Sequence, residues 1–380
     1  QAVDETGKTA RKTPHVLETG WDLQTGEEMK QVFVKNLRSP EHHHRCYRNK
    51  ATSRFIISSL EGAEFLDLEG QHHSQENWLR GSCRSGMMPC NGLLYVPPDQ
   101  CFCEPGAKLL GYAAVAAQRM PQPTNTDTTE RLLRGPAYES PLRQLKADPA
   151  DWPTLRHDAA RHGSSTARVP TEVAPCWQVE LGGPLTAPVM AEGRVYLAQK
   201  DAHRIHALDA ATGEKLWQFT AKGRIDSPPT VAGGRVVFGS CDGHVYCLRA
   251  EDGQLAWRFM AAPHDQRTAY FDQIESSWPV HGSLIVERGL VYCTAGRSTY
   301  LDGGIRLYAL DLESGTVRHQ TVLEGPFPKI PDQRDVSFYV LGANSDVLVS
   351  EGGFLYMRQK KLTPELEEVP IEVLSSKGAQ

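Results

Sequence analysis

The chain has 380 residues, of which 40% are hydrophobic and 23% charged, with 33 glycines and 25 prolines, and this composition excludes wholesale disorder. The net charge is −5 with both signs interspersed, so the sequence lacks the basic footprint of a nucleic-acid-binding protein and a polybasic membrane patch. The longest apolar run, residues 109–117, is well short of the ~18 residues that cross a bilayer. We therefore expect no membrane span and no nucleic-acid partner.

The first predicted element is a strand pair near the amino-terminal end. Residues 1–14 are polar without an apolar period, and we expect a frayed end. A turn follows over 21–26, where Asp22 can accept backbone hydrogen bonds and Gly26 can take a positive φ. Because the chain begins so close to this turn, we expect it to be a piece of a longer protein.

The block from Ser39 to Tyr112 is rich in cysteine, histidine and arginine. It contains two predicted strands, 54–58 and 64–68, but does not follow closely the repeat described below. Its chemistry-bearing residues are His42, His43, His44, Arg45, Cys46, Arg80, Cys83, Arg84, Cys90, Asn91, Cys101 and Cys103. The next segment, 117–150, is polar and punctuated by prolines, which predicts a linker or a long surface excursion.

A repeat of 40 residues then dominates the sequence. Trp177, Trp217 and Trp257 recur at this interval, and glycines, prolines and leucines keep the same offsets around them. Residues of strand periodicity fill each unit, and four strands in about 40 residues are typical of a propeller blade. The predicted strands are 194–198, 204–208, 235–239, 244–248, 290–294 and 305–310.

One unit is longer than its neighbours. Gly253 and Gly315 are 62 positions apart, where Gly213 and Gly253 are 40 apart, so about 22 residues are inserted. The extra length lies in 262–280 and in 295–304. Long insertions on a rigid scaffold are where recognition loops usually lie. The sequence closes with a further strand pair within 347–358 and a polar, acidic tail.

The repeat carries a family resemblance. Ala207-Leu-Asp-Ala-Ala-Thr-Gly-Glu-Lys-Leu-Trp217 resembles the repeat of the PQQ-like β-propellers, and 308–315 is a further copy. That superfamily includes quinoprotein alcohol dehydrogenases and cofactor-free binding propellers, and in it the tryptophan docks one blade on the next. The resemblance implies an all-β propeller of four-stranded blades, either complete or an incomplete fragment of a seven- or eight-bladed ring. We expect amino-terminal blades over 1–116, the linker over 117–150 and repeat blades over 151–380.

The cysteine-rich block resembles the amino-terminal part of large secreted members of this superfamily. The matching segments are His44-Arg-Cys-Tyr47, Arg80-Gly-Ser-Cys-Arg84, Asn91-Gly-Leu-Leu-Tyr95 and Cys101-Phe-Cys103. The extracytoplasmic resemblance favours disulfides among Cys46, Cys83, Cys101 and Cys103, although a metal site and reduced thiols stay open. The remaining cysteines Cys176, Cys241, Cys247 and Cys293 lie in or beside predicted strands and are expected to be small buried thiols.

Two further sites are open to functional and structural interpretations. In a strand, His42 and His44 would share a face and could bind one metal ion, or they could form a polar strand edge. Arg45, Arg80 and Arg84 could surround an acidic ligand, or they could pair with Glu64 and Asp67. Asn91 is the candidate amide ligand if the quinoprotein cofactor pyrroloquinoline quinone (PQQ) binds with calcium.

The resemblance implies function less directly than fold. Quinoprotein dehydrogenases often carry a vicinal cysteine pair, which this sequence lacks. We therefore expect a secreted or periplasmic propeller that presents its loops to a protein or a glycan and has no assigned catalysis. The alternatives are a PQQ-dependent oxidoreductase and, more distantly, a polysaccharide lyase on a propeller.

Overall fold

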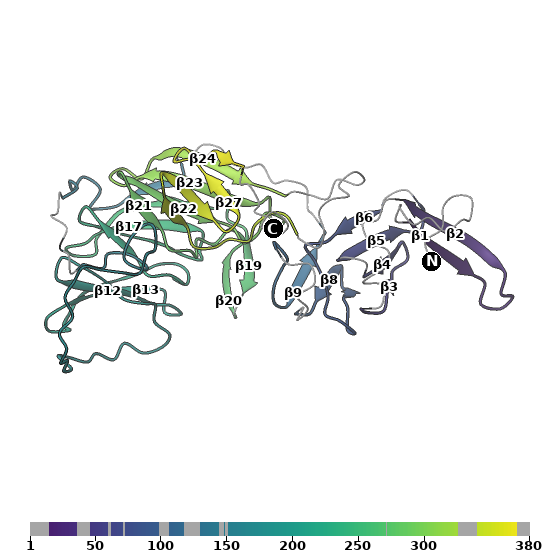
Figure 1. Ribbon diagram of the computed structural model, residues 1–380, viewed down its shortest axis with the longest axis horizontal. Helices are drawn as coiled ribbons and strands as arrows, with labels where there is room; N and C mark the ends of the chain where they lie inside the picture. The colour runs from purple at the N-terminus through teal and green to yellow at the C-terminus, as the bar shows by residue number, and fades with distance from the viewer. Residues whose placement is uncertain are drawn as a thin grey trace, which may run out of the picture. The chain divides into compact units, whose positions relative to one another are not determined.

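The computed structural model describes residues 15–35, 46–59, 62–70, 73–98, 106–117, 130–143, 148, 151–270, 272–325 and 340–370. Every regular element in these ranges is a β-strand (Figure 1). The chain divides into two compact units: unit 1 comprises Gln1–Pro121 and Gly325–Asn344, and unit 2 comprises Gln122–Glu324 and Ser345–Gln380. In the ranges described, we find no helix that could cross a membrane.

Unit 1 consists of short antiparallel sheets. A hairpin pairs β1 (His15–Trp21) with β2 (Glu28–Lys35). A four-stranded sheet contains β3 (Lys50–Ala51), β4 (Phe55–Ser58), β5 (Ala63–Asp67) and β6 (Ser74–Glu76), and a three-stranded sheet contains β7 (Met88–Cys90), β8 (Leu93–Val96) and β9 (Ala113–Ala116).

The first turn of unit 1 has the predicted chemistry. Asp22 Oδ1 accepts hydrogen bonds from the backbone N–H groups of Gln24 and Thr25, each at 2.8 Å. Gly26 has a φ of 71°, which a residue with a side chain rarely adopts.

Unit 2 repeats one four-stranded antiparallel sheet whose strand order follows the chain. Blade 1 contains β11 (Val189–Ala191), β12 (Arg194–Gln199), β13 (Arg204–Asp209) and β14 (Lys215–Thr220). Blade 2 contains β15 (Thr230–Ala232), β16 (Arg235–Gly239), β17 (His244–Arg249) and β18 (Leu255–Met260). Blade 3 contains β21 (Ile285–Glu287), β22 (Leu290–Ala295), β23 (Ile305–Asp311) and β24 (Val317–Leu323), and blade 4 contains β25 (Val349–Glu351), β26 (Phe354–Met357), β27 (Lys360–Leu362) and β28 (Glu368–Val369). All six predicted strands are confirmed, and the sheets are the blades of a β-propeller.

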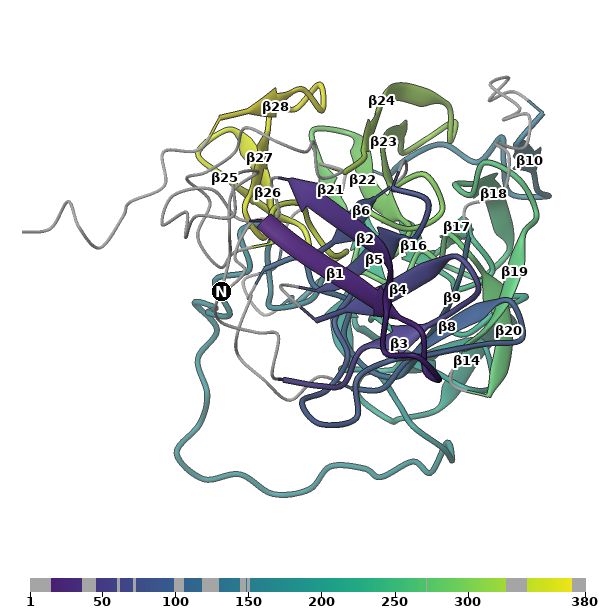
Figure 2. The same ribbon diagram turned by 90° about the vertical axis from the view of Figure 1, so that its right-hand side faces the viewer.

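Two elements add to the blades. The 117–150 segment, predicted as a linker or surface excursion, contains β10 (Leu132–Arg134), which pairs with β18 as the fifth strand of that sheet. The predicted insertion 262–280 contains a hairpin of β19 (Arg267–Tyr270) and β20 (Gln273–Ser276). Figures 1 and 2 show this hairpin as a pair of strands projecting from unit 2.

Each repeated tryptophan docks on the following blade, as the resemblance implied. The indole N–H groups of Trp177, Trp217 and Trp257 donate to backbone carbonyl oxygens in the last turn of blades 1, 2 and 3, at 3.0, 2.9 and 3.0 Å. The same turn of blade 2 contains Gly253 with a φ of 72°, and a Cβ there would lie 2.5 Å from Cε3 of Trp217. The glycine is therefore needed both for the backbone conformation and for the approach of the indole.

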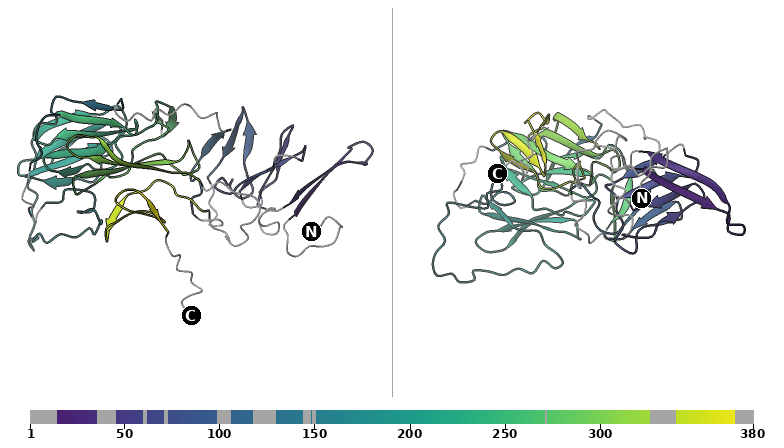
Figure 3. Two further views of the ribbon diagram at one scale, coloured as in Figure 1. Left: turned by 90° about the horizontal axis from the view of Figure 1, so that it is seen from above. Right: turned by 45° about the vertical axis from the view of Figure 1, so that its right-hand side comes forward.

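The hydrophobic core lies between successive blades rather than in one central cluster. One cluster joins blades 1 and 2 around Tyr196, Trp217 and Phe238, and a second joins blades 2 and 3 around Trp257 and Tyr308. In Figure 3 (left) the teal to green strands of unit 2 lie in successive layers. Every residue of β16 is buried because its sheet is covered on both faces, whereas in β14 Trp217 is buried, Phe219 is partly buried and the other residues are exposed.

Candidate functional site

The polar residues of unit 2 gather in the loops at one end of blades 1 to 3. In a four-stranded antiparallel sheet, the turn between the second and third strands leaves at the same end as the connection from the fourth strand to the next sheet. These loops are 221–229, 240–243, 261–284 and 296–304, and we call them the loop face. The inserted hairpin β19–β20 belongs to it.

A buried ion cluster ties the loop face together. The Arg224 guanidinium donates two hydrogen bonds to the Asp226 carboxylate, at 2.7 and 3.1 Å. Glu275 on β20 lies 3.6 Å from Arg224 and 3.3 Å from Arg297, whose guanidinium also donates to two backbone carbonyl groups. The Cys241 thiol donates to Asp226 at 3.2 Å. One cluster thus links loops of blades 1, 2 and 3.

Burial and pairing set the charge states in this cluster. Burial alone would raise the pKa of Asp226, but the hydrogen bonds from Arg224 and Cys241 outweigh it and hold that pKa below its usual value. Burial raises the pKa of the Cys241 thiol, so the thiol stays protonated and unreactive. Both carboxylate oxygens of Glu275 are buried and accept no hydrogen bond from the described residues. The cluster acts as a scaffold for the hairpin.

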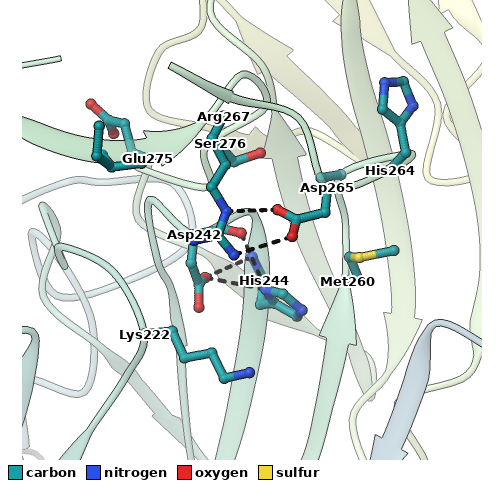
Figure 4. A pocket seen from close by; sticks show the side chains of 11 residues that line it. Lys222, Asp242, His244, Met260, His264, Asp265, Arg267, Glu275 and Ser276 are labelled. Atoms are coloured by element: carbon teal, nitrogen blue, oxygen red, sulfur yellow. Dashed lines mark hydrogen bonds and ion pairs between the residues drawn. The ribbon is translucent and has the colours of Figure 1, made fainter. Parts of the chain in front are cut away.

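A pocket of about 280 Å³ opens beside this cluster (Figure 4). The hairpin forms one wall, and the turn between β16 and β17 forms another. Its lining residues are Lys222, Asp242, His244, Met260, Ala262, His264, Asp265, Arg267, Ile274, Glu275 and Ser276. The lining mixes cations, carboxylates and imidazoles with a few apolar groups, and no Phe, Tyr or Trp is among the described residues that form it. Such a lining suits a small polar ligand.

Asp242 fixes the orientation of His244 in the pocket. The Asp242 carboxylate accepts hydrogen bonds from Tyr246 Oη at 2.6 Å and from the His244 backbone N–H at 3.0 Å. Burial would raise the pKa of Asp242, but these bonds and the adjacent His244 ring hold it below its usual value. The carboxylate is therefore ionised at neutral pH.

The tautomer of neutral His244 follows from its neighbours. Its Nδ1 atom lies 3.3 Å from Asp242 Oδ1 and 3.2 Å from the Asp242 backbone oxygen, and both oxygens can only accept. The proton of the neutral ring therefore lies on Nδ1, and Nε2 keeps a lone pair. His244 offers an acceptor to a ligand.

Two cations complete the lining. Arg267 on β19 pairs with Asp265, at 2.9 and 3.1 Å, and the two side chains are 63% and 68% exposed. The hydrogen bond and charge of Arg267 lower the pKa of Asp265. Lys222 follows β14 and is exposed, and Figure 4 shows its ammonium group on the same side of the pocket as the His244 ring.

Polar contacts fasten the hairpin on both sides. On blade 1, Gln273 bonds the ring Nε2 of His203 at 2.9 Å and donates to Asp201 at 3.3 Å. On blade 3, the Arg297 guanidinium lies 4.6 Å from the centre of the Tyr270 ring. The hairpin thus spans the loop face from blade 1 to blade 3.

The predicted site residues of unit 1 fall in different environments. Arg80 is 1% exposed, and both its guanidinium and the Glu64 carboxylate lie close enough to Tyr47 to influence the pKa of that hydroxyl group, which burial raises. Arg84 is exposed and forms a parallel bridge with Tyr47. Asn91 is exposed in the β7–β8 turn, where its φ of 52° and the φ of 72° at Gly92 form a tight hairpin connection. This turn accounts for the Asn-Gly pair.

The predicted disulfide residues are placed only in part. The Arg84 backbone N–H donates to the carbonyl oxygen of Cys46, which brings the backbones of Cys46 and Cys83 side by side. The disulfides expected among Cys46, Cys83, Cys101 and Cys103, with their pairing open, stay a prediction. His42, His44, Arg45, Cys101 and Cys103 lie outside the described residues.

The cysteines of unit 2 follow the expectation with one correction. Cys241, Cys247 and Cys293 are buried unbridged thiols. Cys176 is exposed, because the segment that contains it is anchored only through Trp177 and is not covered by another strand.

Sequence reasoning missed the individual residues of the pocket. Asp242 and His244 lie at a turn between two correctly predicted strands, where nothing in the sequence distinguishes them from ordinary turn residues. The available signal was the insertion 262–280, which contributes Ala262, Arg267 and Ile274 among others.

Comparisons with known proteins agree with the repeat. A family model described as "Outer membrane protein assembly factor BamB" matches residues 173–352. The quinone alcohol dehydrogenase subunit of Acetobacter aceti is 29% identical over 147 residues, 36% of this chain and 19% of that protein. The assembly factor BamB of Burkholderia pseudomallei is 29% identical over 155 residues, 40% of this chain and 35% of that protein. The matches therefore span between about a fifth and about a third of these relatives.

Solved structures give weaker likenesses. BamB of Moraxella catarrhalis aligns over 93% of this chain and 90% of that chain, with 12% identity and a TM-score of 0.32. Quinohemoprotein alcohol dehydrogenase of Comamonas testosteroni aligns over 47% of this chain and 29% of that chain, with 20% identity and a TM-score of 0.37. The 40-residue repeat, its docked tryptophans and the sequence matches identify the repeats within residues 173–352 as PQQ-like β-propeller repeats.

Proposed function

We propose that this chain is an extracytoplasmic binding propeller, periplasmic or secreted, whose loop face binds a glycan. The observation that carries the proposal is the pocket beside the inserted hairpin, which is lined by polar side chains and in which hydrogen bonds hold Asp242 and His244 in place. Carboxylate, imidazole, ammonium and guanidinium groups supply the hydrogen bonds that sugar hydroxyl groups need. The name of one relative, an outer membrane protein assembly factor, supports the location.

A protein ligand is the second possibility for the same loops. Tyr270 and Ile274 on the hairpin are 43% and 65% exposed, and together they make a small apolar surface among the described residues. The concave polar pocket favours the glycan. Binding of a protein instead would be an outcome of the experiment below.

Screening the protein against an array of immobilised glycans tests the proposal. Ile274→Arg should abolish binding, because the longer charged side chain fills the pocket while position 274 is exposed enough to accept it. Thr268→Arg is the matched control, since Thr268 is an exposed hairpin residue outside the pocket lining. Binding to no glycan, or equal effects of the two substitutions, would reject the loop face as a glycan site.

PQQ-dependent oxidation is the second candidate function, and the quinone alcohol dehydrogenases among the relatives favour it. The described residues do not fit the cofactor. Calcium takes about six to eight oxygen ligands, yet Asp226 and Glu275 already face arginines, and no group of three His, Cys, Asp or Glu side chains in the described ranges could hold a metal. Among the residues that the structure describes, the pocket lining also offers no Phe, Tyr or Trp ring on which a flat quinone could stack.

Direct addition of the cofactor separates the two candidates. With PQQ, calcium and an artificial electron acceptor present, we expect no turnover of alcohols or sugars and no rise in the thermal unfolding midpoint. Quinone-dependent reduction of the acceptor would establish an oxidoreductase, and it would show that ligand binding is not the whole function of this chain.

A further inference from the structure

We infer that the pocket is selective for a hydroxylated carboxylate, of which a uronic acid sugar is the representative class. This inference rests on the proposed glycan-binding function and specifies its ligand. It follows from two cations in the pocket lining, Lys222 and Arg267, and from the hydrogen-bond acceptor that His244 presents beside them.

The charges of the lining are not equally available to a ligand. Asp242 is 12% exposed and accepts hydrogen bonds from Tyr246 and His244. Glu275 is 3% exposed and faces Arg224 and Arg297. These two carboxylates are therefore turned towards the protein, and their charge is partly compensated there.

The cations of the lining remain accessible. Lys222 is exposed, and the structure gives its ammonium group no ion pair within the described residues. Arg267 pairs with Asp265, which is itself 68% exposed, and the charge of Asp242 also acts on Arg267. The Arg267–Asp265 pair is so exposed that it contributes little to stability and can exchange with a ligand group. A carboxylate that enters the pocket can therefore accept hydrogen bonds from the Lys222 ammonium group. It can also replace Asp265 as the partner of the Arg267 guanidinium.

The acceptors explain why a simple carboxylate would not suffice. His244 presents the lone pair of Nε2, because Asp242 holds the ring proton on Nδ1. A buried or half-buried acceptor that loses water must gain a donor, and the hydroxyl groups of a sugar are such donors. Met260 and Ala262 add apolar surface for the carbon skeleton.

The test compares three small probes by isothermal titration calorimetry: D-glucuronate, D-glucose and propionate. We expect D-glucuronate to bind at least about tenfold more tightly than either of the others, because D-glucose lacks the carboxylate and propionate lacks the hydroxyl groups. Its affinity should fall with ionic strength, because the Lys222 contact is exposed to solvent. The His244 ring signals should shift in the NMR spectrum when D-glucuronate is added.

Variants assign the selectivity to Lys222. Lys222→Gln should weaken D-glucuronate binding about tenfold and leave D-glucose unchanged, because the charged hydrogen bond is lost while a polar side chain, one atom shorter, is kept. Lys215→Gln is the control, since Lys215 is an exposed lysine of β14 in the same unit and outside the pocket. Equal binding of D-glucose and D-glucuronate, or a Lys222→Gln variant with unaltered D-glucuronate affinity, would overturn the inference.

Glycan binding by the loop face and selectivity for uronates are tested by different outcomes. Binding of neutral glycans that is lost in Ile274→Arg would keep the proposed function and reject the uronate selectivity. Binding of no saccharide at all would reject both.

Discussion

His206 is a buried histidine whose titration should make the protein less stable in acid. It lies on β13 with 1% of its surface exposed, and burial lowers its pKa to about 4, with further lowering by Lys215 and Arg204. The ordinary value is 6.5, so between these two pH values the unfolded chain binds a proton that the folded chain does not. Stability should therefore fall as the pH decreases through this window, by roughly 3 kcal/mol at most.

Urea denaturation at pH 7 and pH 4 measures this effect. In His206→Gln the difference between the two pH values should shrink. His162 provides a control of opposite sign: its exposed ring bonds the Asp158 carboxylate, which raises its pKa, so its contribution is present in acid and lost as the pH rises through the folded pKa. An unchanged acid sensitivity in His206→Gln would show that other groups cause it.

The residues of the repeat turns could be predicted because their chemistry is local. Asp209 Oδ1 accepts hydrogen bonds from the N–H groups of Ala211 and Thr212, both at 2.9 Å, and Gly213 has a φ of 75°. These requirements depend on a few consecutive residues. The pocket around His244 depends instead on which loops meet in space, and no short stretch of sequence contains that information.

The hairpin β19–β20 is an element whose order should depend on Gln273. This side chain makes the hairpin contacts with His203 and Asp201 of blade 1. Gln273→Ala removes both, and each hydrogen bond contributes about 0.5–1.5 kcal/mol. We expect faster amide hydrogen exchange in β19 and β20, with the exchange of β16 and β17 unchanged.

Thr268→Ala is the matched control, since Thr268 is an exposed residue of the same hairpin and has no side-chain hydrogen bond among the described contacts. Equal exchange in wild type and Gln273→Ala would mean that the buried ion cluster alone orders the hairpin.

The strands of the blades could be predicted from their period of two, and the insertion from its length. The pairing of β10 with β18 could not, because three residues carry too little pattern to specify a partner more than 100 positions away.

At the scale of the whole molecule, stability should be distributed between neighbouring blades. The two large core clusters of unit 2 each join one blade to the next, so a defect at one contact acts mainly on that pair. The docked tryptophans allow this to be measured, because the same glycine turn occurs at three contacts that differ in burial: Trp177 is half-buried, Trp217 is 8% exposed and Trp257 is 0% exposed.

Alanine substitutions at the three turn glycines should therefore cost different amounts. A Cβ at Gly213, Gly253 or Gly315 would lie 2.5–2.6 Å from the docked indole. Gly193→Ala is the control, since its φ of 71° brings the same backbone strain, about 1–2 kcal/mol, while no atom lies within 4 Å of the new Cβ.

Beyond this strain, overpacking should add about 1–3 kcal/mol at Gly253 and Gly315. Gly213→Ala should lie near the control, because Trp177 belongs to a segment outside the sheets and can move away from the new methyl group. Gly315→Ala should cost most, because the new methyl group would also lie 2.8 Å from Leu132 and the docked Trp257 is fully buried. Denaturant midpoints of the four variants, at unchanged m-values, measure the series. Equal costs at all four positions would show that indole docking adds nothing to the stability of the blade stack.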